Sequence, residues 1–303
     1  MSQTTWRGVF PAATTQFDAG YAVDLDATQS VVNMLVEDGV HGVIAMGTVG
    51  ENNSLRAEEK RQVLAAVVEA VSGRVPVVTG VSELTTELAS EYIRDAQSIG
   101  ADGAMVLPAM VYVPSEAELE AHFRLVAAAS DLPIMLYNNP PAYRVSLSIE
   151  SLQRLADVPT LRTIKESAPD SRRITDILNA CGDRYQVFAG LDDIALEGLL
   201  LGAEGWVSGL TNAFPRESIA LWDAVQAGRL DEARAIYRWF MPLLHLDADH
   251  DLVQSIKLSE AVMGRGSERV RMPRMELSGQ RRADVIRMVE TARDTRPSLI
   301  AAE

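Results

Sequence analysis

The sequence predicts a (β/α)8 barrel of the α/β class, followed by a C-terminal helical extension. Short β-branched or apolar runs alternate with longer amphipathic segments, which is the pattern of βα units around a parallel sheet. Eight such runs occur, each followed by a segment of helical periodicity. Eight βα units close a barrel more naturally than they fill an open sheet. The strand pattern stops after Gly228, so we predict a barrel over residues 1–227 and an extension over residues 228–303.

Each predicted element follows from local periodicity. The apolar runs predict strands over residues 8–14, 40–47, 75–81, 103–107, 133–137, 161–165, 186–190 and 205–209. The amphipathic segments between them predict helices over residues 26–37, 57–71, 83–99, 116–129, 149–155, 171–180, 194–201 and 216–227. In the extension we predict helices over residues 230–246, 251–262 and 280–293, broken by the glycines of residues 264–267 and by Pro273.

Composition limits the possible partners and compartment. The formal net charge is -14, and no basic patch offsets it, so we expect neither a nucleic-acid partner nor an anionic membrane surface. Cys181 is the only cysteine, which excludes an intrachain disulfide and favours a reducing, cytoplasmic location. No apolar run approaches the roughly 20 residues that span a bilayer.

Lys165 is the main candidate for catalysis. The chain has only three lysines; Lys60 and Lys257 occur in helical segments, whereas Lys165 ends an apolar strand. In barrels of this kind the chemistry takes place at the carboxyl ends of the strands. Burial there lowers the pKa of an ammonium group, and a neutral amine attacks carbonyls to form imines. The alternative is a structural lysine, paired with one of three nearby carboxylates: Glu51, Glu166 or Asp192.

Several strand ends carry motifs that resemble a known family. The loop of residues 47–51 reads Gly-Thr-Val-Gly-Glu, residues 137–140 read Tyr-Asn-Asn-Pro, and residues 164–167 read Ile-Lys-Glu-Ser. Gly190-x-Asp192 and the segment of residues 202–208 follow in order. Together they resemble the dihydrodipicolinate synthase and N-acetylneuraminate lyase family of class I, Schiff-base-forming enzymes, over nearly the whole chain.

The resemblance implies roles for individual residues. The implied catalytic residues are Lys165, which would form the imine, Tyr137, which would relay the proton, and Thr48. The Thr48 hydroxyl would also bind the substrate carboxylate, together with the backbone of Gly47 and Val49. The remaining substrate contacts implied by these motifs are Ser167, Gly190, Asp192, Asp193, Val207 and Ser208. Glu51 is expected to anchor its loop. The family also implies a homotetramer, a small 2-oxo acid as substrate, and no metal or organic cofactor.

Three positions depart from the synthase branch of the family. Val49 replaces a second threonine, Met110 or Val111 replaces a tyrosine, and Ala142 replaces an arginine that would hold a second carboxylate. Arg144 is a possible substitute for that arginine. These departures argue against a true dihydrodipicolinate synthase.

The positions of Ser167, Asp192 and Asp193 instead resemble the hydroxyl-reading positions of the sugar-acid branches. We therefore expect an aldolase, dehydratase or deaminase that acts on a hydroxylated 2-oxo acid or a related cyclic imine, such as a 2-oxo-3-deoxy sugar acid or 4-hydroxy-pyrroline-2-carboxylate. The alternatives are a pyruvate-condensing, dihydrodipicolinate synthase-like enzyme and a non-catalytic ligand-binding barrel.

Two other chemistries occur on the same fold. A metal-dependent aldolase needs ligands at strand ends, but none of the four histidines ends a predicted strand. The acidic and histidine-rich segment of residues 245–251 is predicted to lie in a helix–loop–helix outside the barrel. Pyridoxal phosphate on Lys165 would need a phosphate cradle, for which residues 208–211 are the candidate.

Overall fold

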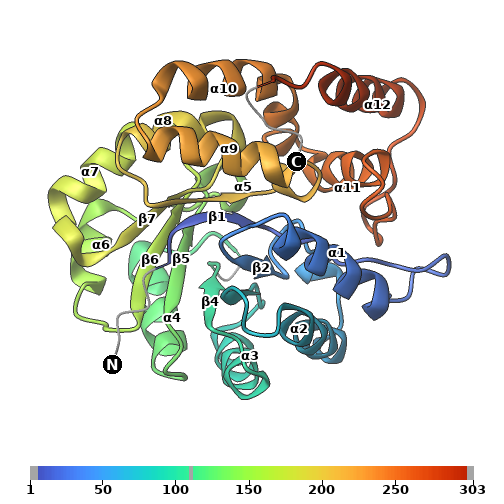
Figure 1. Ribbon diagram of the computed structural model, residues 1–303. Coiled ribbons are helices and arrows are strands. Elements are labelled where there is room, and N and C mark those ends of the chain that lie inside the picture. Colours follow the sequence, from blue (N-terminus) through green and yellow to red (C-terminus); the bar gives the residue numbers. More distant parts are fainter. Residues whose placement is uncertain (1–5, 109–111, 299–303) are drawn as a thin grey trace.

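The computed structural model of the protein describes residues 6–108 and 112–298. Its strands form one parallel sheet, in the order β1-β8-β7-β6-β5-β4-β3-β2. The N–H of Ala13 donates to the carbonyl of Ile44 at 2.9 Å, and the N–H of His41 donates to that of Val9 at 3.0 Å. These bonds join β1 to β2 and close the sheet, which confirms the predicted barrel (Figure 1). The strands are β1 (Gly8–Pro11), β2 (Val43–Ala45), β3 (Val77–Val81), β4 (Gly103–Val106), β5 (Ile134–Asn138), β6 (Leu161–Glu166), β7 (Gln186–Ala189) and β8 (Gly205–Ser208).

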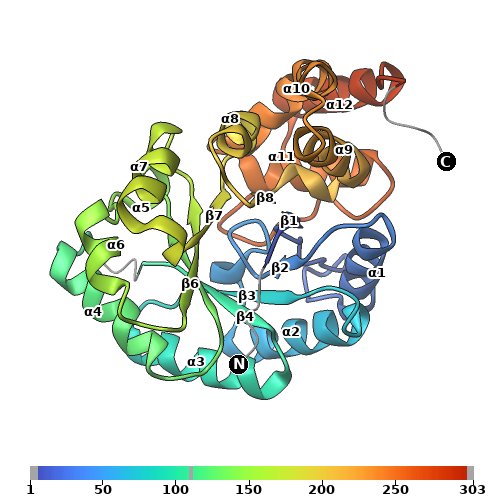
Figure 2. The same cartoon turned by 60° about the vertical axis from the view of Figure 1, so that its left-hand side comes forward.

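Helices follow the strands in chain order and surround the barrel (Figure 2). They are α1 (Leu25–Glu37), α2 (Ala57–Val71), α3 (Thr86–Ile99), α4 (Glu116–Ala127), α5 (Pro140–Tyr143), α6 (Ile149–Leu155), α7 (Arg172–Cys181), α8 (Ala195–Leu200) and α9 (Pro215–Gln226). Side-chain caps set several of the beginnings. The predicted helix over residues 83–99, for example, begins at Thr86 because the Thr85 hydroxyl accepts the N–H of Leu88. The short helix α5 was not predicted.

The C-terminal extension consists of α10 (Leu230–Leu244), α11 (Leu252–Val262) and α12 (Gly279–Asp294). Figures 1 and 2 show these helices grouped on the side of the barrel where α9 lies. The helix predicted over residues 230–246 ends at Leu244, because residues His245–Asp247 tighten into a 3-10 turn. The predicted division after residue 227 falls in the connection between α9 and α10. Whether the two parts are separate units remains a prediction.

Two hydrophobic clusters hold the barrel together. The larger lies between the strands and the surrounding helices, and the smaller fills the inside of the barrel. Inside, Phe10 of β1 packs edge-on against Phe188 of β7, with ring centroids 5.3 Å apart. The inner cluster also contains Tyr137. The inside of the barrel is therefore a packed core that leaves space only near the strand ends.

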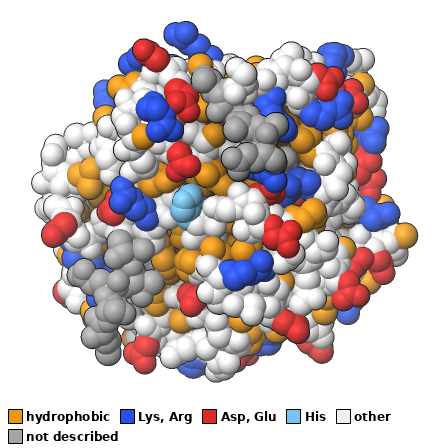
Figure 3. Space-filling view, viewed as in Figure 1, with side chains coloured by type: hydrophobic (Ala, Val, Ile, Leu, Met, Phe, Trp, Pro, Cys, Tyr) orange, Lys and Arg blue, Asp and Glu red, His pale blue; other side chains and the backbone are white. Residues whose placement is uncertain are grey.

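The face of the molecule seen in Figure 1 carries charged side chains of both signs among apolar ones (Figure 3). Among residues 6–108 and 112–298, no helix is long and apolar enough to cross a membrane.

Candidate active site

Lys165 and Tyr137 lie side by side at the carboxyl ends of β6 and β5. The register of these parallel strands pairs the two residues directly, so both side chains point to the same face of the sheet. Tyr137 belongs to the inner cluster, which fixes this face as the inside of the barrel. The Nζ atom of Lys165 is 4.2 Å from the centroid of the Tyr137 ring. A lysine and a phenol therefore meet at the mouth of the barrel, as the sequence predicted.

The amine of Lys165 makes no hydrogen bond or ion pair with the part of the chain that the structure describes. Its side chain is only 7% exposed, and this burial lowers the pKa of the ammonium group, although Asp247 and Tyr143 oppose the shift. The three carboxylates that the sequence offered as partners are bound elsewhere: Glu51 by Lys257, Glu166 by Arg173, and Asp192 by Trp206. The geometry therefore favours a nucleophilic amine over a structural ion pair.

Tyr137 is part of a polar network with Asn139, Tyr143 and Thr48. Its phenol oxygen accepts a hydrogen bond from Nδ2 of Asn139 at 3.0 Å. The Tyr143 ring, from α5, packs edge-on against it at 5.5 Å, and the hydroxyl groups of Tyr143 and Thr48 are 3.0 Å apart. Burial raises the pKa of Tyr137 to about 12, and contacts with Asn139, Ser167 and Tyr143 partly offset this shift. The phenol is thus protonated at neutral pH and able to transfer its proton.

The loop between β2 and α2 presents free backbone N–H groups. It is bounded by Met46 and Glu51, which both have left-handed backbones, with φ of 51° and 57°. Such conformations cost energy in non-glycine residues and cluster at functional sites. Within the described chain, the N–H groups of Thr48 and Val49 donate no hydrogen bond. Consecutive free N–H groups form a concavity that suits a carboxylate.

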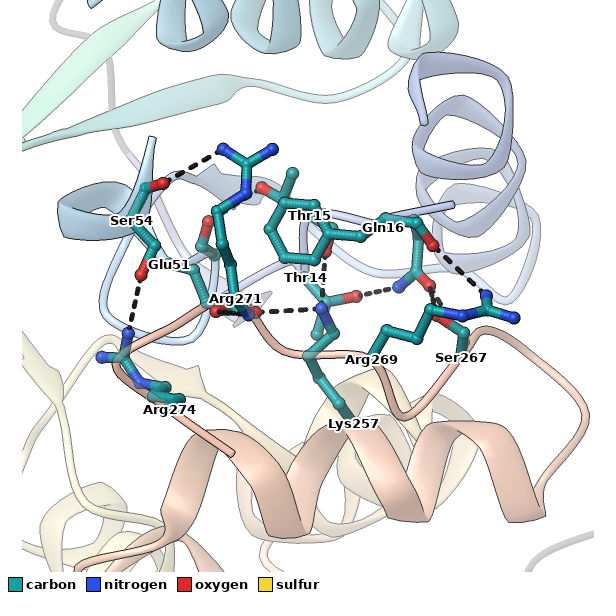
Figure 4. A network of polar contacts seen from close by, with 12 residues as sticks. Thr14, Thr15, Gln16, Glu51, Ser54, Lys257, Ser267, Arg269, Arg271 and Arg274 are labelled. Carbon is teal, nitrogen blue, oxygen red and sulfur yellow. Dashed lines mark hydrogen bonds and ion pairs between the residues drawn. The ribbon is translucent and has the colours of Figure 1, made fainter. Parts of the chain in front are cut away.

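Buried charges hold this loop in place (Figure 4). Lys257 of α11 donates to the Glu51 carboxylate at 2.9 Å and to the carbonyl of Thr15 at 2.8 Å. The N–H of Arg271 donates to the other Glu51 oxygen at 2.9 Å. Lys257 and Glu51 are fully buried. The expectation that Glu51 anchors its loop is confirmed, and the C-terminal extension supplies the partner.

A small cavity opens beside Lys165. Of the residues that the sequence proposed, those that line it are Gly47, Thr48, Val49, Tyr137, Lys165, Gly190 and Val207. Its other lining residues are Ala12, Met105, Asn139, Ala142, Leu191, Gly209, Asp247 and Leu252. Among the described residues, Lys165 is the only cation in the lining. Arg144 is exposed, lies outside the lining and caps the end of α5. Met110 and Val111 lie outside the described residues.

The other proposed contacts lie away from the cavity surface. The Asp192 carboxylate accepts hydrogen bonds from Trp206, from the Ser208 hydroxyl at 3.1 Å and from the N–H of Leu210 at 2.9 Å. Asp193 contacts His245. Ser167 is fully buried, and its hydroxyl has no hydrogen-bond partner in the described residues, although it lies close enough to Tyr137 to lower the phenol pKa. Ser167 therefore influences Tyr137 without lining the cavity itself.

The structure adds two residues that sequence reasoning missed. Tyr143 comes from the short helix α5, and Asp247 comes from the C-terminal extension. The segment of residues 245–251 was expected to lie outside the barrel; that expectation was wrong for Asp247, which lines the cavity with Lys165. The acidic composition of the segment is visible in the sequence, but whether Asp247 points toward the barrel depends on how α10 ends. No local pattern predicts that ending.

The residues considered for metal or pyridoxal phosphate have other partners. Asp249 and Asp251 both bind Arg281, and the described residues contain no group of three or more side chains placed to hold a metal. The candidate phosphate cradle, residues 208–211, lies at the carboxyl end of β8. There the N–H of Leu210 donates to Asp192, and the N–H of Thr211 donates to the hydroxyl of Ser208. These donors are therefore not free to bind a phosphate.

Gly190, directly after β7, lets the backbone approach Lys165 closely. A Cβ atom at this position would lie 2.1 Å from the hydroxyl oxygen of Ser167 and 2.8 Å from Cγ of Lys165. We expect Gly190→Ala to lower kcat roughly 10²-fold, because a shift of about 1 Å in a reacting group has that effect. Steady-state kinetics of this variant would measure it, with Gly20→Ala as the control, because a Cβ atom on Gly20 would meet only Oδ1 of Asp18, at 3.4 Å. Equal kcat in both variants would contradict the close approach.

Comparison with known proteins places these features in a family. The profile of the dihydrodipicolinate synthetase family matches residues 5–292. The 4-hydroxy-tetrahydrodipicolinate synthase of Geotalea uraniireducens is 33% identical over 289 residues, which cover 94% of this chain and 98% of that protein. The crystal structure of dihydrodipicolinate synthase from Aquifex aeolicus superposes with a TM-score of 0.91 at 28% identity, and covers 95% of this chain and 98% of that one. YagE of E. coli, solved in complex with pyruvate, superposes with a TM-score of 0.90 at 27% identity, and covers 96% and 99%.

Proposed function

The chain belongs to the dihydrodipicolinate synthetase family of class I, Schiff-base-forming lyases, and we propose that it acts on a small hydroxylated 2-oxo acid or a related cyclic imine. A 2-oxo-3-deoxy sugar acid and 4-hydroxy-pyrroline-2-carboxylate are the substrates that we put first. The observation that carries this proposal is the unpaired, buried amine of Lys165 beside Tyr137, in a cavity with no second cation in its described lining.

The proposed reaction begins with binding of the substrate carboxylate by the free N–H groups of Thr48 and Val49. Lys165 then attacks C2 of the substrate. A 2-oxo acid loses its carbonyl oxygen as water, and a cyclic imine releases its ring nitrogen as an amine; in both cases the resulting imine withdraws electrons from the adjacent bonds. Tyr137 moves the proton, with Tyr143 and Thr48 extending the hydroxyl chain behind it. The substrate bond that breaks is set by the groups around its distal carbons.

The distal part of the cavity argues against a second carboxylate. Ala142, where the synthase branch carries an arginine, lines the cavity, and so does the carboxylate of Asp247. An aspartate semialdehyde would bring its own carboxylate toward Asp247 without a cation to pair it. Pyruvate condensation nevertheless stays the second candidate, because the relative from Geotalea uraniireducens carries the synthase name.

A substrate panel tests the proposal. We expect turnover with the hydroxylated 2-oxo acids or the hydroxylated pyrroline, with products identified by mass spectrometry, and little with pyruvate plus aspartate semialdehyde. Turnover confined to that last pair would overturn the substrate class and support the synthase. A ligand that binds with the same affinity after Lys165→Ala, and is never turned over, would support the non-catalytic barrel.

Replacing Tyr137 by phenylalanine removes only the hydroxyl group that is proposed to move the proton. We expect kcat to fall roughly 10²- to 10⁴-fold, the usual contribution of a positioned acid–base group. Tyr237→Phe is the matched control, because the Tyr237 hydroxyl binds Glu197 and the carbonyl of Asp193 and lies outside the cavity lining. Both variants are compared by steady-state kinetics after a check of thermal unfolding. A Tyr137→Phe enzyme as fast as the wild type would remove Tyr137 from the mechanism.

The homotetramer, the cytoplasmic location and the absence of a cofactor remain predictions. Light scattering on the purified chain measures the assembly, and a dimer or monomer would replace the tetramer.

A further inference from the structure

Asp247 shares the cavity with Lys165 but has no assigned role. It lies in the 3-10 turn after α10, and this turn directs it toward the ends of β7 and β8. Lys165 and Asp247 influence each other electrostatically, yet no direct ion pair joins them. Both groups line the same cavity, so a substrate held as an imine on Lys165 would lie within reach of the Asp247 carboxylate.

The Asp247 carboxylate packs closely against the backbone of Gly209. A Cβ atom on Gly209 would lie 2.3 Å from Oδ1 of Asp247, so the absence of a side chain at Gly209 makes room for this carboxylate. The neighbouring acidic side chain of Asp192 is satisfied by Trp206, by Ser208 and by the N–H of Leu210. By contrast, no side chain of the described residues donates a hydrogen bond to the Asp247 carboxylate, whose neighbouring donor is the backbone N–H of Asp192.

The other polar side chains of the cavity lining already have roles or partners: Thr48, Tyr137, Lys165 and Asn139. Leu191, Val207 and Leu252 also line the cavity, and apolar side chains cannot fix the position of a hydroxyl group. Partial burial also raises the pKa of Asp247 to about 6. A carboxyl group that titrates near neutral pH can both accept and donate a proton.

We propose that Asp247 binds the C4 hydroxyl group of the substrate and exchanges a proton with that oxygen during bond cleavage. This inference rests on the proposed function, because it assumes the imine at Lys165. It names the substrate class as 2-oxo monocarboxylic acids with a hydrogen-bond donor on C4. A second carboxylate at that position would be repelled by Asp247.

Two cleavages fit this contact, and both are redox-neutral. In an elimination, Tyr137 has already given its proton away during imine formation, and as a phenolate it takes the C3 proton. The C3–H electron pair then forms the C3–C4 double bond, and the C4 oxygen leaves as water with the proton of Asp247. In an aldol cleavage, Asp247 takes the C4 hydroxyl proton, the O–H pair forms the C4 carbonyl, and the C3–C4 pair moves into the imine as an enamine. C3 then takes its proton from Tyr137.

The test compares Asp247→Asn with the wild type on two kinds of substrate. The first is the hydroxylated probe, 2-oxo-3-deoxygluconate or 4-hydroxy-pyrroline-2-carboxylate, whichever the wild type converts faster. The second is pyruvate, which has no C4 and is trapped on Lys165 by borohydride. We expect kcat/KM for the hydroxylated probe to fall about 10²-fold or more, whereas trapping of pyruvate stays at the wild-type level.

Controls separate this proposal from the proposed function. Asp249→Asn changes a nearby carboxylate that binds Arg281 and should leave both readouts unchanged. Gly209→Ala should displace the Asp247 carboxylate and reproduce the selective loss. Unchanged kcat/KM in Asp247→Asn would overturn the role of Asp247 alone, and so would an equal loss of pyruvate trapping, which indicates a structural effect. If the wild type traps no 2-oxo acid, the proposed function itself fails.

Discussion

Replacing Lys165 by alanine is expected to lower kcat by at least about 10³-fold, because no covalent intermediate can form without the amine. The substitution should leave the fold intact. The ammonium group makes no ion pair in the described residues, and its burial is unfavourable for the charged form. Steady-state kinetics and thermal unfolding of the same preparation measure both expectations.

Two further variants test whether the loss of activity comes from the missing nucleophile or from the missing positive charge. Lys165→Arg keeps a positive charge but cannot provide a neutral amine, because arginine stays protonated in proteins; it should be as inactive as the alanine variant. Lys60→Ala removes a lysine that binds Glu83 outside the cavity and should keep wild-type turnover. Substantial activity in Lys165→Arg would mean that the charge of this residue matters and that its nucleophilicity does not.

Replacing Lys257 by methionine is expected to destabilise the fold by about 3–5 kcal/mol, because it leaves the buried charge of Glu51 without its partner. Both side chains of the pair are fully buried, so water cannot replace the lost ammonium group. The loop that carries Thr48 would lose its anchor at the same time. Denaturant unfolding, followed by circular dichroism, measures the loss.

A surface pair and a double variant are the controls for this prediction. Arg234→Met breaks an exposed ion pair with Asp231 and should have little effect on stability. The double variant Lys257→Met with Glu51→Leu should lose less stability than the sum of the two single variants, because no unpaired charge remains. Strictly additive losses would show that Lys257 and Glu51 do not stabilise each other.

The fold and the reacting pair could be predicted because they depend on local patterns. The apolar run that ends at Lys165 and the one that ends at Tyr137 are both short and regular, and neighbouring parallel strands bring such ends together. The structure pairs these two residues directly. The loop of residues 47–50 was equally accessible to prediction, since its glycines and Thr48 follow a strand.

The distal half of the site depends on tertiary packing instead. Asp192 ends up bound to Trp206 and Ser208 rather than lining the cavity, and nothing near it in the sequence reveals those partners. Asp247 reaches the site only because α10 tightens into a 3-10 turn beside Gly209. Tyr143 reaches Thr48 through a helix of a single turn, which is too short to show a periodic pattern.

Borohydride trapping followed by intact-mass and peptide mass spectrometry tests the central claim most directly. Wild-type protein incubated with pyruvate, or with a hydroxylated 2-oxo acid, should gain the mass of one reduced adduct, and fragmentation should place it on Lys165. The gain should disappear in Lys165→Ala and persist in Lys60→Ala. An adduct on another lysine, or no adduct with any 2-oxo acid, would contradict the assignment of Lys165 as the Schiff-base residue.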